Sequence, residues 1–95
     1  MSMKDAYEKK LQARLDEWDA EIKKLKAQAD EAEADAQREY YQQIDQLKRD
    51  RERAQQKLEE LQKSSEGAWE DLRAGIESAW TDLEEAMKAA RARFK

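Results

Sequence analysis

Apolar residues recur every three or four positions over residues 7–61, and this spacing limits the fold more than any other feature of the sequence. Residues so spaced lie on one face of an α-helix. The stripe consists of Tyr7, Leu11, Leu15, Trp18, Ile22, Leu25, Ala29, Ala32 and Ala36, and then of Ile44, Leu47, Ala54, Leu58 and Leu61. We therefore predict one long coiled-coil helix over residues 1–63, which at about 1.5 Å per residue would be about 90 Å long.

Two features interrupt the stripe. Its spacing widens to eight residues around Tyr40 and Tyr41, where we expect the helix to shift its contact face or to change partner. Arg51 occupies a stripe position that an apolar residue would normally fill. Its aliphatic stem can pack there while its guanidinium group reaches an acidic partner.

Residues 27–36, with the sequence AQADEAEADA, are rich in alanine and in acidic residues. Because small side chains let two helix backbones approach closely, we interpret this segment as a tight helix–helix contact. The alternative interpretation is a solvated stretch of helix with little packing.

Residues that weaken a helix gather at positions 62–67, with the sequence QKSSEG. Gly67 suits the C-terminus of one helix, and Ser64 and Ser65 suit the N-cap of the next. We predict a hinge or tight turn at residues 64–67. The alternative is an uninterrupted helix, because a single glycine costs only about 1 kcal/mol there.

An eleven-residue repeat follows the hinge. Residues 68–78 and 79–89 share the pattern A-W-x-D-L-x-x-x-φ-x-x, in which φ is apolar. Eleven residues in three turns correspond to about 3.67 residues per turn, which is close to a straight helix. We predict an amphipathic helix over residues 68–95. Its apolar face, the candidate partner face, consists of Trp69, Leu72, Ile76, Trp80, Leu83 and Met87, with Phe94 beyond them.

The composition favours an all-α fold. Charged residues make up 44% of the chain, proline is absent and glycine occurs only twice. Hydrophobic residues, many of them alanine, can fill a narrow contact between helices but not a thick core. We expect a long helix followed by a shorter one, in an αα-hairpin, an antiparallel helical oligomer or both. The candidate helix-interface residues are Leu11, Leu15, Trp18, Ile22, Leu25, Ile44, Leu47, Leu58 and Leu61.

Two arrangements fit the stripe. In the first, the C-terminal helix folds back on the long helix and leaves the stripe from Tyr7 to Ala32 for another chain to cover. In the second, two copies pair antiparallel about Tyr41, so that the acidic residues of 30–35 face the basic residues of 48–53. Both can coexist in an antiparallel dimer of hairpins, which is the arrangement that we favour.

The residue inventory argues against catalysis. The chain has no histidine and no cysteine, which removes the commonest general base, the soft metal ligands and the thiol nucleophile. No glycine-rich phosphate loop is present, and the acidic residues project away from the stripe. We expect neither an enzyme nor a cofactor or metal site. The function that we expect is that of a coiled-coil scaffold or partner-binding protein.

Charge and hydropathy restrict the partners. The net charge is −4 and both signs are interspersed, which argues against nucleic acid. No apolar run opens the chain, so we expect a cytoplasmic protein. The alternative function is binding to a membrane surface or lipid through Trp69 and Trp80. We disfavour it because residues 66–95 carry seven acidic against five basic side chains. The expected partners are a second copy, with a dimer favoured, and another protein.

Three segments carry a family resemblance: residues 18–27, the Tyr40–Tyr41 pair and residues 68–77. They resemble small bacterial coiled-coil proteins, some of which are named as stress-response proteins. The resemblance covers nearly the whole chain and implies a bacterial cytoplasmic protein linked to stress, with no catalytic residues to carry over. The eleven-residue repeat is also similar in style to apolipoprotein-like and desiccation-protein helices.

Overall fold

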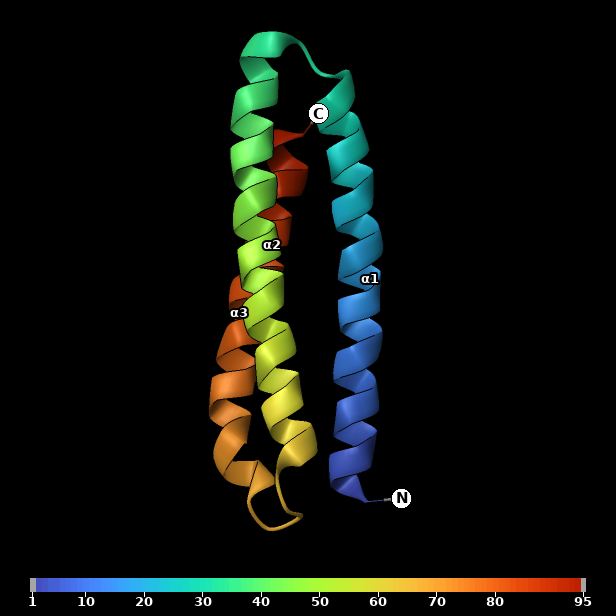
Figure 1. Ribbon diagram of the computed structural model, residues 1–95, viewed down its shortest axis with the longest axis vertical. Helices are drawn as coiled ribbons and strands as arrows, with labels where there is room; N and C mark the ends of the chain where they lie inside the picture. Colours follow the sequence, from blue (N-terminus) through green and yellow to red (C-terminus); the bar gives the residue numbers. More distant parts are fainter. Residues whose placement is uncertain (1, 95) are drawn as a thin grey trace.

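The computed structural model describes residues 2–94, so Met1 and Lys95, the expected ends of the two helices, lie outside the described residues. Three helices follow one another: α1 (Met3–Glu31), α2 (Ala34–Lys63) and α3 (Trp69–Arg93). They lie side by side, with α1 and α3 running in one direction and α2 in the other (Figure 1). The molecule measures 51 × 20 × 18 Å. The expected all-α fold of packed helices is confirmed, and no strand occurs within residues 2–94.

The single long helix expected over residues 1–63 is corrected by the structure. α1 ends at Glu31, and the chain reverses at Ala32 and Glu33, which we call the first corner. Both corner residues have extended backbone, with φ and ψ of −73° and 159° at Ala32 and of −64° and 152° at Glu33. A continuous helix would leave the apolar stripe in water, whereas the reversal packs one half of the stripe against the other. Burial therefore outweighs the strong local preference for helix.

Side chains of α2 stabilise the first corner. The amide of Gln37 donates to the carbonyl oxygens of Ala29 (3.2 Å) and Asp30 (3.3 Å) in the last turn of α1. The hydroxyl group of Tyr41 donates to the carboxylate of Asp30. This bond lowers the pKa of Asp30 and raises the pKa of Tyr41. Tyr41, expected to mark a shift in the stripe, is thus a corner residue.

The second corner spans residues 64–68, where we expected the hinge. Its capping differs from the expectation, because Ser64 rather than Gly67 caps α2 and donates both its backbone N–H (3.1 Å) and its hydroxyl (2.6 Å) to the Leu61 carbonyl. Gly67 does not adopt a positive φ. The residue that precedes α3 is Ala68, which offers no side-chain cap. The turn is held by the Ser65 carbonyl, which accepts backbone hydrogen bonds from Ala68 and Trp69.

All nine candidate helix-interface residues are buried in one core that the three helices share. The part of the stripe that lies on α1 is covered by α2 and α3 of the same chain. The structural reason for expecting a second chain to cover it is therefore removed. Within residues 27–36 only Ala29 is buried, so this segment is a solvated corner rather than the tight contact that we expected.

Candidate binding groove between α1 and α3

The candidate partner face of α3 points into the bundle. Trp69, Ile76, Trp80, Leu83 and Met87 are all buried, and Leu72 is half-buried against the same core. The indole nitrogen of Trp80 is buried with no hydrogen-bond partner. In the closed chain these side chains are core residues, and a partner can meet only the edges of this face.

Aromatic pairs join α1 to α3. Tyr7 lies against Trp69 with 5.5 Å between ring centroids, and Trp18 lies against Trp80 at 6.4 Å. Tyr7 and Trp18 are eleven residues apart, as are Trp69 and Trp80. Because α1 and α3 run in the same direction, the repeat of α3 meets a matching spacing on α1. The spacing of Tyr7 and Trp18 is visible in the sequence, but the apolar stripe places both residues on one long helix and does not indicate that they face α3.

Each aromatic pair carries an arginine. The guanidinium carbon of Arg14 lies 5.2 Å from the ring centroid of Trp18, and that of Arg73 lies 5.5 Å from the centroid of Tyr7 and 5.9 Å from that of Trp69. Burial and the nearby carboxylate of Glu77 raise the pKa of Tyr7. A cation over an aromatic face is attracted by the negative charge density of the ring. The arginines therefore cover the outer edges of these aromatic pairs.

Ion pairs also span α1 and α3. Arg14 bonds Glu84 at 3.2 Å, and Arg91 bonds Glu21 at 2.5 Å. Since these side chains are largely solvated, each pair contributes less than about 1 kcal/mol. They fix how α1 faces α3 more than they stabilise the fold.

A shallow groove runs along the line between α1 and α3. Both helices pack closely on α2 but only lightly on each other. Three hollows lie along this line, and a fourth continues past the end of α3 to the first corner. The groove is lined by Lys10, Lys24 and Gln28 of α1, by Glu77 and Thr81 of α3, and by Phe94 just beyond α3. We call this surface the α1–α3 groove.

The end of α3 is fastened to α2. Phe94 stacks on Tyr40 with 4.1 Å between ring centroids, and the Tyr40 hydroxyl donates to the carbonyl of Arg93 at 3.2 Å. α3 ends short of the first corner (Figure 1), which leaves the last hollow between α1 and α2 uncovered by a helix.

Arg51 sets the register between α1 and α2. Its Nε and Nη2 atoms donate to the two carboxylate oxygens of Asp19 at 2.8 and 3.0 Å. The bonds to Asp19 are the main reason why the pKa of Arg51 is raised. Arg51 thus reaches an acidic partner, as we expected, but this partner is Asp19 and not the acidic block of residues 30–35.

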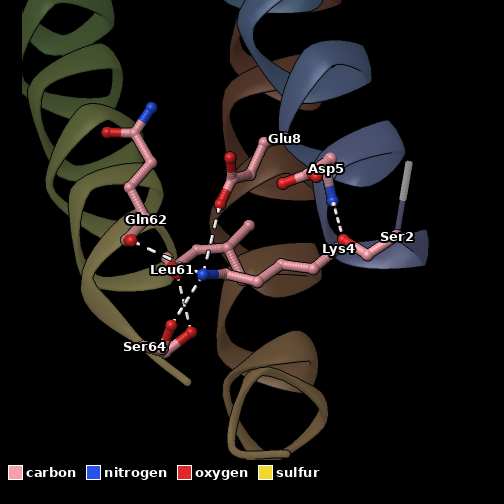
Figure 2. A network of polar contacts seen from close by, with 7 residues as sticks. All are labelled: Ser2, Lys4, Asp5, Glu8, Leu61, Gln62 and Ser64. Atoms are coloured by element: carbon pink, nitrogen blue, oxygen red, sulfur yellow. Dashed lines mark hydrogen bonds and ion pairs between the residues drawn. The ribbon is translucent and has the colours of Figure 1, made fainter. Parts of the chain in front are cut away.

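Lys4 ties the start of α1 to the second corner, and no feature of the sequence had marked it. Its side chain is among the buried ones, and its ammonium donates to the carbonyl of Ser64 at 2.6 Å and to that of Gln62 at 3.5 Å (Figure 2). Glu8 lies 3.6 Å from the same nitrogen. A cation at the C-terminal end of a helix satisfies free carbonyls and complements the helix dipole.

Replacing Lys4 by methionine should lower the free energy of unfolding by about 1–2 kcal/mol, because the side chain keeps its length but loses its charged hydrogen bonds. Urea unfolding followed by circular dichroism measures the change. The matched control is Lys48→Met at an exposed position of α2, which should change the stability by less than about 0.5 kcal/mol. Equal effects of both substitutions would contradict the role of Lys4.

Three further features of residues 2–94 concern metal binding, membrane insertion and the exposed surface. No group of three acidic, histidine or cysteine side chains is placed to hold a metal ion there. Within the same residues, no helix has the length and apolarity needed to cross a membrane. The surface exposes one large hydrophobic side chain, Met3, in the described part of the chain.

Comparison of this chain with family models, with curated proteins and with solved structures finds no match. The resemblance to small bacterial coiled-coil proteins, some of them named as stress-response proteins, therefore stays a prediction.

Proposed function

We propose that this chain is a non-enzymatic helical scaffold that binds an amphipathic helix of another protein along the α1–α3 groove. The observation that carries the proposal is the uneven packing of the bundle. α2 is covered by both of its neighbours, whereas α1 and α3 leave a groove along most of their length. A fourth helix placed there would complete a four-helix bundle.

The walls of the groove fit such a partner. The edges of Trp18 and Trp80, which are otherwise buried, lie at the centre of its floor. Its rims carry both signs of charge, with Lys10 on α1 and Glu77 on α3. A helix with an apolar stripe flanked by acidic and basic residues matches this surface. A strongly basic or strongly acidic partner would be repelled by one rim.

A lipid surface is the second candidate function. It rests on the tryptophans, which in the closed bundle lie in the core. Lipid binding would require α3 to leave the bundle, and its excess of acidic side chains opposes approach to anionic lipid. The groove of the closed bundle therefore favours binding of a protein helix over binding of lipid.

Titration of the isotope-labelled chain with a synthetic helix that carries a leucine stripe between lysine and glutamate residues tests the proposal. In NMR spectra, we expect the changes in backbone amide chemical shift to be largest at Lys10, Lys24 and Thr81. Thr81→Arg should block the groove and weaken binding about tenfold or more, whereas Lys48→Glu on α2 should leave binding unchanged.

The lipid alternative is tested on the same protein with tryptophan fluorescence. We expect blue-shifted emission in plain buffer that vesicles leave unchanged. Two results together would refute binding along α1 and α3: a shift in tryptophan emission on adding vesicles, and peptide-induced changes in amide chemical shift that fall only outside the groove.

A further inference from the structure

The first corner is made of residues that favour a helix. Ala32 and Glu33 are flanked by Glu31 and Ala34, and alanine and glutamate are among the best helix formers. No glycine or proline lies in residues 27–36, and Glu33 caps α2 without a side-chain hydrogen bond. The local sequence thus favours a straight helix from Met3 to Lys63, which the packing of α1 on α2 and α3 bends, with help from the hydrogen bonds of Gln37 and Tyr41 at the corner.

The contacts that hold α1 do not depend on which copy supplies it. Asp19 bonds Arg51, Lys4 bonds the carbonyl of Ser64, and Trp18 packs on Trp80. All three join α1 to residues beyond the first corner. A second copy of α1 in the same place would make each of them.

We propose that two copies of this chain form a dimer by exchanging α1, with Ala32 and Glu33 becoming part of one continuous helix in each copy. α1 of each copy then packs on α2 and α3 of the other. Exchange through a short corner retains the native contacts and removes a locally unfavourable turn. This inference does not depend on what the α1–α3 groove binds.

The acidic residues around the corner oppose the exchange. Contacting residues of α1 and α2 are separated by fewer residues of sequence the nearer they lie to the first corner, as the pairs Lys4 with Ser64 and Asp19 with Arg51 show. In the exchanged dimer the first corners of the two copies therefore lie side by side. These segments bring together Glu33 and Asp35 of both copies, whereas Asp30 and Glu31 lie opposite residues 37–40, which include Arg38. Lys26, 3.6 Å from Asp30, offsets part of this charge. We expect salt to favour the dimer because it screens the repulsion.

The closed chain is expected at low concentration, since a two-residue linker keeps α1 close to its own α2. Refolding from denaturant at about 1 mM chain in about 0.5 M salt should give a dimer, and refolding at micromolar concentration should give a monomer. Light scattering after size exclusion measures both species. The dimer should keep the helix content of the monomer.

Ala34→Pro separates exchange from ordinary association. Ala34 is the first residue of α2, where proline is tolerated, and the extended Glu33 before it suits proline as well. Inside a continuous helix the same proline is strongly unfavourable, and the exchanged dimer contains two such helices, so the dimerisation constant should fall on the order of ten-thousandfold. Ala32→Gly with Ala34→Gly should act in the same direction by about tenfold or more, without a proline. The opposite variant, Glu31→Gln with Glu33→Gln and Asp35→Asn, should raise the dimer fraction at low salt.

A charge-reversal pair gives the sharpest test. Asp19→Arg and Arg51→Asp each place like charges between α1 and α2 of a closed chain. In an exchanged heterodimer of the two variants, the introduced arginine meets the introduced aspartate, and the native Asp19 meets the native Arg51. When the two variants are refolded together, we expect heterodimers to form under conditions in which neither variant alone forms a homodimer. The absence of heterodimers, or a dimer that Ala34→Pro leaves intact, would overturn the proposal.

Discussion

Leu83→Ala is expected to lower the free energy of unfolding by about 3–5 kcal/mol, because the side chain is fully buried between α3 and the rest of the bundle. Leu72→Ala removes the same atoms from a half-buried position of the same helix and should cost about 1 kcal/mol. Urea unfolding followed by circular dichroism gives both values.

This comparison tests whether α3 belongs to the core of its own chain. The unfolding midpoint should not depend on chain concentration in the micromolar range, since the core is intramolecular. Similar costs at Leu83 and Leu72, or a midpoint that rises with concentration, would show that α3 packs elsewhere.

Trp80→Ala is the second substitution with a large expected effect, a loss of about 3–5 kcal/mol. Trp80→Phe should cost much less, about 1 kcal/mol, because it removes a buried indole N–H that has no partner in the structure. A double-mutant cycle of Trp18→Leu and Trp80→Leu, which removes the aromatic rings, should show a coupling of about 0.5–1.5 kcal/mol between the two positions. Strict additivity of the two substitutions would contradict the contact between α1 and α3.

The sequence predicts the core of this protein better than its topology. Spacing identified most of the large buried apolar residues, because a helix can bury only one face and the apolar side chains mark that face. The buried residues Lys4, Ala79 and Ala90 were not among those predicted. The sequence also placed a reversal near Ser64, where polar and flexible residues gather. These predictions depend on local chemistry, which a single sequence displays directly.

The first corner could not be predicted in the same way. Ala32 and Glu33 have the local preference of a helix interior, and their extended backbone results from burial of distant residues. One signal was present in the sequence. The apolar stripe loses its regular spacing around Tyr40, so its N-terminal and C-terminal halves need not lie on one face of a single straight helix. We expected a change of partner there, and the structure shows a reversal a few residues earlier.

The candidate site also combines features that the local sequence predicts with features that depend on distant packing. The eleven-residue spacing of Trp69 and Trp80 was visible, but that these residues face Tyr7 and Trp18 depends on α1 folding back. Lys4 could not be found from the sequence at all, because its partners are backbone carbonyls at the far end of α2. A lysine in the first turn of a helix has no pattern that marks it.

The helices α1, α2 and α3 bury a shared apolar core within one chain, and small-angle X-ray scattering at micromolar concentration can show this directly. We expect a monomer of 11.2 kDa with a radius of gyration close to the 15.4 Å of the Cα atoms, and a longest dimension near 51 Å. A straight helix over residues 1–63 would give a rod about 90 Å long. A particle of that length, or twice the mass, under these conditions would contradict the closed three-helix bundle.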